Sequence, residues 1–147
     1  MKTAAFILFF LTGPLLFSYA QNQSTKVEIF DKTEQMPEFP GGPDSLMAFL
    51  VKNLKYPESA LNINLQGVVR VKFVTDEHGK VTRYKILRSD FTTDEKFKKV
   101  NDSFARRDLE KEALRVVAIM PDWKPGYQNG KAVKVFFTLP VTYELSD

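Results

Sequence analysis

The segment "GKAVKVFFTLPVTYEL", residues 130–145, constrains the fold most strongly, because apolar and polar residues alternate along it. Alternation with a period of two is typical of a strand that buries one face. The apolar positions are Val133, Val135, Phe137, Leu139, Val141, Tyr143 and Leu145. Pro140 lacks a backbone N–H and is tolerated only where no ladder donor is needed. Pro140 is therefore tolerable if this strand lies at the edge of a sheet.

Two more strands precede it. After Gly67, "VVRVKFVTD" alternates with Val69, Val71 and Phe73 on one face, and "VTRYKILRS" follows a short turn, "DEHGK". Gly79 in that turn can adopt positive φ. Two alternating runs joined by so short a turn predict a β-hairpin.

Helical spacing occurs in two places. Leu46, Phe49, Leu50 and Leu54 predict a first helix over residues 44–53. Residues 57–60 suit a single helical turn, and the apolar positions of "LEKEALRVVAIM" predict an amphipathic helix over 109–120.

A chain that is 44% hydrophobic and 27% charged is ordinary for one globular domain. The expected fold class is α+β, with a three-stranded antiparallel sheet packed on two helices.

The N-terminal region indicates export. Residues 1–20 combine an early lysine, an apolar run and a small-residue cleavage pattern ending at Ala20, which is typical of a signal peptide. The alternative is an uncleaved inner-membrane anchor with the domain on the periplasmic side. Residues 21–36 read as a linker, and residues 37–147 as the domain, with a charged insertion at 90–108.

No constellation of catalytic or metal-binding residues stands out. There is no cysteine, and the lone histidine, His78, falls in the hairpin turn, where a solvated side chain is expected. No phosphate-binding glycine loop is present. We therefore predict no enzymatic activity, no metal and no cofactor. Trp123 is expected to pack at the edge of the core, and Phe136 to lie on the exposed side of the last strand.

The charge pattern does not favour nucleic acid. Basic and acidic residues are mixed along the chain, the formal net charge is +3, and the densest basic stretches are short, at 96–99 and 105–108. A solvated surface accounts for such a pattern more simply than a nucleic-acid interface does.

Several motifs in order resemble the C-terminal domain of TonB, the energy transducer of Gram-negative bacteria. They are Tyr56-Pro57, "QGVVRVKFVTDEHGKVTRYKILRS" at 66–89, "EALRVVAIMPDWKPG" at 112–126 and the last strand at 130–145. The resemblance implies a periplasmic domain that binds the TonB box of an outer-membrane receptor by strand addition. It also implies a motor of ExbB and ExbD type that drives transport with the proton-motive force.

The resemblance further implies which residues would contact the partner. The edge strand would contribute Val133, Lys134, Val135, Phe136, Phe137, Thr138 and Leu139, and residues Tyr56 and Pro57 would line the same surface. Open sheet edges also permit a homodimer by exchange of elements.

Two features depart from that family. Only residues 21–35 separate the leader from the domain, a reach of at most about 50 Å, and residues 90–108 lengthen the passage to the second long helix. A free periplasmic adaptor or envelope protein that binds another peptide, without transducing force, is therefore the alternative. A small hydrolase or ligand carrier is a third hypothesis, which the missing catalytic groups disfavour.

Overall fold

The computed structural model describes residues 26–146, so the expected signal peptide at 1–20 and the first part of the linker lie outside the described residues. The main elements are α1 (Gly42–Asn53), α2 (Glu58–Leu61), β1 (Gln66–Thr75), β2 (Val81–Thr92), α3 (Ser103–Ala118), β3 (Gly126–Gln128), β4 (Lys131–Val133) and β5 (Val135–Tyr143). A 3-10 turn at Glu95–Phe97 lies between β2 and α3.

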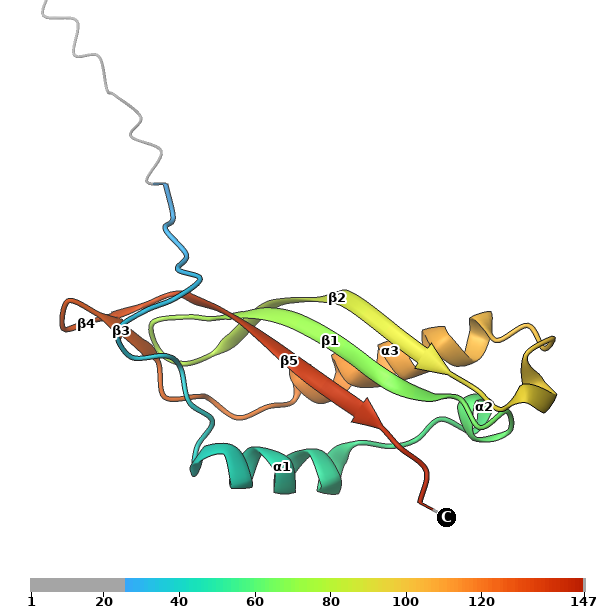
Figure 1. Ribbon diagram of the computed structural model, residues 1–147. Helices are drawn as coiled ribbons and strands as arrows, with labels where there is room; N and C mark the ends of the chain where they lie inside the picture. The colour runs from blue at the N-terminus through green and yellow to red at the C-terminus, as the bar shows by residue number, and fades with distance from the viewer. Residues whose placement is uncertain (1–25, 147) are drawn as a thin grey trace, which may run out of the picture.

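The main sheet has three antiparallel strands in the order β2-β1-β5, which confirms the predicted α+β class and places β5 at one edge (Figure 1). α3 packs against β1 and β2, while α1 lies below β5 in that view. One face of the sheet is therefore covered by helices, and we call the opposite side the open face.

The core forms where the alternating strands meet the helices. Val69, Val71 and Phe73 of β1 are fully buried, as expected from the alternation, and Leu139 and Val141 of β5 join them. The buried stripe of α3 comprises Ala105, Leu109, Ala113, Val116 and Val117. Burial of each of the valine, leucine and phenylalanine side chains in this layer contributes roughly 1.5–3 kcal/mol, and the two alanines contribute less.

Trp123 completes the core, as predicted. It is 4% exposed, and its indole ring meets the rings of Phe39, Phe73 and Phe137 at centroid distances of 5.6, 5.4 and 4.9 Å. These edge-to-face geometries are among those that aromatic pairs prefer. Trp123 therefore holds the segment after α3 against the sheet.

The last strand is shorter than the sequence predicted. The alternating run is interrupted at Lys134, and its first residues form β4, which pairs with β3 in a separate hairpin. The hairpin turn is Asn129-Gly130, with φ values of 51° and 74°. A two-residue Asn-Gly turn needs positive φ at both positions and fits the twist of a hairpin, so residues 131–133 pair back onto β3, and only residues from Val135 onward pair with β1.

The charged insertion expected at 90–108 is divided among the end of β2, a 3-10 turn and the start of α3. β2 continues to Thr92, where Gln66 of β1 still pairs with it, and α3 already begins at Ser103. The helix was expected to begin at Leu109, but Ala105 adds a further buried position one turn earlier. Phe104 points to solvent and is 70% exposed, which obscures the helical pattern in the sequence.

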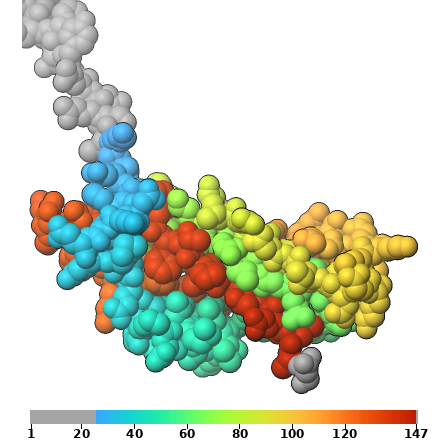
Figure 2. All heavy atoms as spheres, in the orientation of Figure 1, coloured from blue at the N-terminus to red at the C-terminus, as the bar shows by residue number. Residues whose placement is uncertain are grey.

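The described part of the expected linker is attached to the domain. Gln35 exchanges backbone hydrogen bonds with Tyr127 of β3, and Glu38 exchanges them with Lys124. Phe30 forms a parallel bridge to Val135 at the start of β5. Residues 30–38 therefore lie along the hairpin end of the molecule, and Figure 2 shows them covering the start of β5.

Candidate functional site: the edge of β5

The register of the sheet determines which backbone groups of β5 face outward. β5 pairs with β1 so that Val71 lies opposite Leu139 and Val74 opposite Phe136. The N–H of Phe136 donates to the carbonyl oxygen of Phe30 at 2.8 Å, so the backbone N–H and C=O groups of Phe136 point away from β1. Residues two apart in a strand point their N–H and C=O groups to the same side. Thr138, Pro140 and Thr142 therefore also direct their backbone groups outward.

Part of this edge is already occupied. The N–H of Phe30 donates to the carbonyl oxygen of Lys134 at 2.9 Å, and the Phe136 amide returns the second bond of the bridge. Among residues 26–146, no backbone hydrogen bond from outside the sheet reaches Thr138, Pro140 or Thr142. We call residues 138–142 the free edge; the three outward-facing residues are exposed, and the red surface of β5 is visible in Figure 2.

Pro140 fits this edge. It lies opposite Arg70 at an outward-facing position, where a donor would have no partner in β1. The proline therefore costs no ladder hydrogen bond. It also leaves a gap in the row of outward-facing N–H donors between Thr138 and Thr142, so a partner strand can form fewer backbone hydrogen bonds there.

The residues predicted to contact a partner are spread over different environments. Val133 belongs to β4, Lys134 and Phe136 bond to Phe30, and Val135 and Leu139 are buried in the core. Phe137 packs on Trp123. Thr138 alone in this set is an exposed residue of the free edge.

Tyr56 lies at the opposite end of β5. Its ring meets that of Tyr143 edge-on at 5.5 Å, and its hydroxyl donates to the carbonyl oxygen of Leu65 at 2.6 Å. Burial raises the pKa of Tyr56. Pro57 is the residue that precedes α2. The structure thus brings Tyr56 and Pro57 close to the far end of the free edge and not to residues 133–136.

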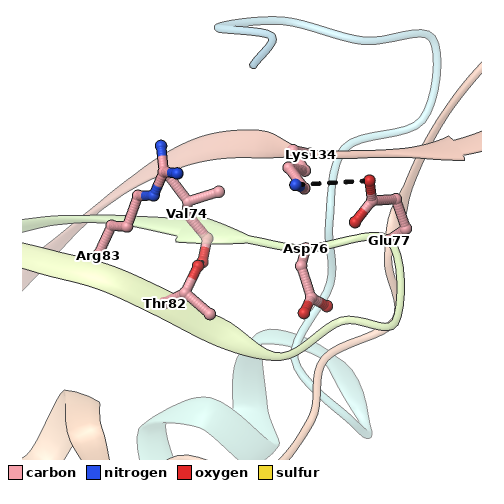
Figure 3. Close-up of a pocket in the computed structure, with 6 residues that line it drawn as sticks. All are labelled: Val74, Asp76, Glu77, Thr82, Arg83 and Lys134. Atoms are coloured by element: carbon pink, nitrogen blue, oxygen red, sulfur yellow. Dashed lines mark hydrogen bonds and ion pairs between the residues drawn. The ribbon is translucent and has the colours of Figure 1, made fainter. Parts of the chain in front are cut away.

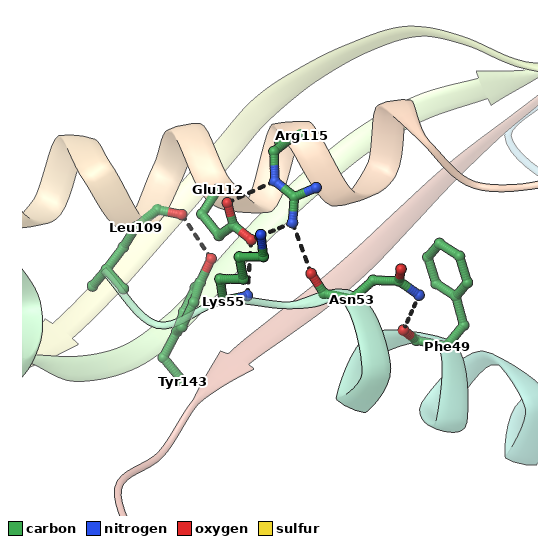
Figure 4. A network of polar contacts seen from close by, with 7 residues as sticks. All are labelled: Phe49, Asn53, Lys55, Leu109, Glu112, Arg115 and Tyr143. Carbon is green, nitrogen blue, oxygen red and sulfur yellow. Dashed lines mark hydrogen bonds and ion pairs between the residues drawn. The ribbon is translucent and has the colours of Figure 1, made fainter. Parts of the chain in front are cut away.

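A polar network holds that far end in place (Figure 4). The hydroxyl of Tyr143 donates to the carbonyl oxygen of Leu109 at 2.8 Å, and burial raises its pKa further than any other cause. Glu112 accepts hydrogen bonds from Arg115 and from the backbone N–H of Lys55. Burial alone would raise the pKa of Glu112, but these donors and their charges outweigh it and lower the pKa. The network ties α3 to the segment between α1 and α2.

A hollow of about 240 Å³ lies on the open face beside this end of β5. It is lined by Gln66, Gly67, Val68, Thr92, Thr142, Tyr143 and Glu144. Gly67 cannot be replaced without a clash, because it has a φ of 153° and a Cβ there would lie 2.0 Å from the carbonyl oxygen of Asp90. Since Thr142 and Tyr143 line this hollow, the free edge ends beside a depression large enough for a side chain of a bound segment.

The described residues contain no group of three or more His, Cys, Asp or Glu side chains arranged to hold a metal ion. Within residues 26–146, no helix combines the length and the apolar character required to cross a bilayer.

Residues 52–95 match the model of the family described as Gram-negative bacterial TonB protein C-terminal. This confirms the resemblance to the TonB C-terminal family. The matched segment runs from the end of α1 through β1 and β2, and stops before α3 and β5. No curated protein matches the chain.

Two solved structures of the Helicobacter pylori TonB C-terminal domain are similar to this chain. The NMR structure of residues 179-285 is 19% identical, with a TM-score of 0.44, and covers 74% of this chain and 88% of its own. The NMR structure of residues 194-285 is 17% identical, with a TM-score of 0.43, and covers 71% of this chain and 94% of its own. With TM-scores this low, the fold assignment rests on the strand order and register of the chain itself.

Proposed function

We propose that this protein is a periplasmic binding module of the TonB C-terminal type, which takes part in proton-motive-force-driven transport across the outer membrane. Its partner would be the TonB box, a short segment of an outer-membrane receptor. That segment would add to the free edge as a further strand. The observation that carries the proposal is the row of outward-facing backbone groups on β5 that begins where Phe30 leaves the edge.

Strand addition suits this edge on physical grounds. Backbone hydrogen bonds to Thr138 and Thr142 would provide affinity that does not depend on the partner's sequence, whereas the hollow beside Tyr143 would select a side chain. Each such bond contributes about 1 kcal/mol net. Because Pro140 lacks a backbone donor, the edge can form few hydrogen bonds with a partner strand, which favours a weak, reversible complex.

The proposal includes a motor of the ExbB and ExbD type as the source of force, and export through the N-terminal leader. The alternative is an adaptor that binds a peptide at the same edge without transducing force. N-terminal sequencing of the purified mature protein separates the two. A mature chain that begins at Gln21 would contradict direct force transduction, because its inner-membrane connection would be lost.

The edge itself is tested by peptide binding. Fluorescence anisotropy would measure labelled peptides that span the N-terminal segments of the TonB-dependent receptors encoded in the same genome. Thr138→Pro removes one outward-facing N–H without removing a bond to β1, and Pro140 shows that an equivalent position two residues later accepts proline. We expect binding about fivefold weaker or more, with the thermal midpoint within a few degrees of the wild type.

The matched control is Thr138→Val, which keeps the N–H and changes only the side chain. It should bind nearly as well as the wild type. Equal binding by the proline variant and the wild type would rule out hydrogen bonding at Thr138. Equal loss in both variants would indicate recognition of the threonine side chain instead of the backbone.

A further inference from the structure

The open face of the sheet carries a concentration of positive charge that comes from separate strands. Paired residues share a face, and two of the pairs between β1 and β2 are Arg70 with Arg88 and Lys72 with Lys85. Like charges directly opposite each other on a sheet are destabilising. Such pairs are therefore costly unless a counter-charge lies nearby.

Two more cations extend this group toward the hairpin turn. Arg83 and Lys134 line a cavity of about 250 Å³ with Val74 and Thr82, and two acids, Asp76 and Glu77, line it as well (Figure 3). Arg83 has a φ of 49°, where the pairing register of β2 shifts. A bulge of this kind redirects a side chain relative to a regular strand. We call Arg70, Lys72, Arg83, Lys85, Arg88 and Lys134 the basic face.

Four acids, Asp31, Asp76, Glu77 and Asp90, lie beside the six cations and neutralise the basic face only in part. Asp90 is shared by Arg88 and Arg70, and the hydrogen bonds and charges of these two arginines lower its pKa. Glu77 and Asp31 each approach one lysine at 3.8 Å. Among the described residues, Lys85 and Arg83 form no ion pair. The face therefore keeps a surplus of positive charge, in a chain whose formal net charge is only +3.

We propose that the basic face binds an acidic polypeptide segment in extended conformation. Residues two apart in a strand, such as Arg70 and Lys72, are separated by about 6.6 Å, and the same spacing separates alternate side chains of an extended peptide. A segment with carboxylates at alternate positions can therefore place one opposite each like-charged pair. This surface is distinct from the free edge, and binding to it does not depend on strand addition at β5.

The chain itself provides an instance of this chemistry. Asp31 follows Phe30 in the N-terminal segment, and its carboxylate lies 3.8 Å from the ammonium group of Lys72. The same ammonium group lies 4.1 Å from the centroid of the Phe136 ring. A polypeptide carboxylate thus already approaches one corner of the basic face, next to the pair of Lys72 with Lys85.

The test uses a fluorescein-labelled peptide in which Glu and Thr alternate, with a Lys and Thr alternating peptide as the charge control. Lys85→Glu reverses an unpaired charge and places an acid opposite Lys72, so the sheet should remain folded. We expect the acidic peptide to bind the wild type and to bind this variant about tenfold more weakly. Added salt should weaken binding to the wild type.

Lys111→Glu is the matched control, because Lys111 is exposed on α3, outside the basic face. It changes the net charge equally and should leave the affinity unchanged, as should Thr138→Pro at the free edge. A loss in Lys111→Glu equal to that in Lys85→Glu would overturn the proposal, since net charge alone would then explain binding. A loss of affinity for the acidic peptide in Thr138→Pro alone would also overturn the proposal, because the peptide would then bind at the free edge of β5 and not at the basic face.

Absence of binding by the acidic peptide would overturn the proposal outright and leave the cations as a solubilising surface. Two further probes identify other anionic partners. Binding of a DNA duplex or of phosphatidylglycerol vesicles without binding of the acidic peptide would contradict a polypeptide partner, and would assign the basic face to a nucleic acid or to a lipid surface.

Discussion

The backbone N–H of Phe136 donates a hydrogen bond to the carbonyl oxygen of Phe30 at 2.8 Å, and the free edge of β5 begins after this contact. At the start of β5, the N-terminal segment of the chain takes the place of a partner strand. Further along β5, the outward-facing backbone groups of Thr138 and Thr142 form no hydrogen bond with backbone from outside the sheet within residues 26–146. The proposed binding site is thus the part of β5 that residues 26–38 leave uncovered.

The first prediction concerns that bridge. Phe30→Pro removes the N–H that donates to Lys134, so the bridge should open more often and the Phe136 amide should exchange with solvent roughly fivefold faster. Hydrogen exchange followed by NMR measures this directly. Val27→Pro is the control, because Val27 forms none of the inter-element backbone hydrogen bonds. Unchanged exchange at Phe136 would show that the bridge does not protect this amide.

A second prediction concerns the turn between β1 and β2. Gly79 has a φ of 82°, and a Cβ there would lie 1.6 Å from the carbonyl oxygen of Trp123. The Trp123 N–H also donates to the carbonyl oxygen of Gly79 at 2.8 Å. Gly79→Ala should therefore lower the free energy of unfolding by about 3 kcal/mol or more, through strain and displacement of Trp123.

Gly130→Ala provides the comparison for Gly79. Gly130 has a φ of 74°, but a Cβ there would meet nothing within 4 Å. Only the conformational cost remains, about 1 kcal/mol. Chemical denaturation of both variants measures the difference. Equal destabilisation would mean that the close approach of Gly79 to Trp123 is absent in solution.

A third prediction concerns the pH dependence of stability. The pKa of Glu112 is lowered in the folded chain, so its contribution is fully present above the ordinary glutamate pKa, about 4.3, and is lost as the pH falls through the lowered value. Glu112→Gln should lower the free energy of unfolding by about 1–2 kcal/mol at neutral pH. Denaturation at a series of pH values should show the gap between variant and wild type narrowing below about pH 4. A constant gap would exclude the carboxylate charge as its cause.

The sequence predicted the elements whose pattern is local. The alternation of apolar and polar residues predicted β1, β2 and β5, and the spacing of Leu46, Phe49 and Leu50 predicted α1. An element that buries one face repeats its apolar residues with its own structural period, which is two residues in a strand and about 3.6 in a helix. The edge position of β5 was implied by the family resemblance, and Pro140 is consistent with it, since only an outward-facing position tolerates the missing donor.

Other features were predicted less well, for physical reasons. The Asn129-Gly130 turn is a strong hairpin signal that could have predicted the pairing of β3 with β4, but the interruption of the last strand at Lys134 falls inside an unbroken alternation and leaves no signal in the sequence. The bridge at Phe30 leaves no periodic pattern, since a single residue makes it. The basic face brings together residues from β1, from β2 and from the junction of β4 and β5, so it depends on strand register and cannot be recognised in any one stretch of sequence.

The central claim is strand addition at the free edge, and amide hydrogen exchange of the labelled domain with and without a bound receptor peptide tests it most directly. Strand addition should give alternating protection: the amides of Thr138 and Thr142 become slow to exchange, whereas those of Leu139 and Val141, which already face β1, change little. Peptide binding with no added protection at Thr138 and Thr142 would exclude strand addition at this edge.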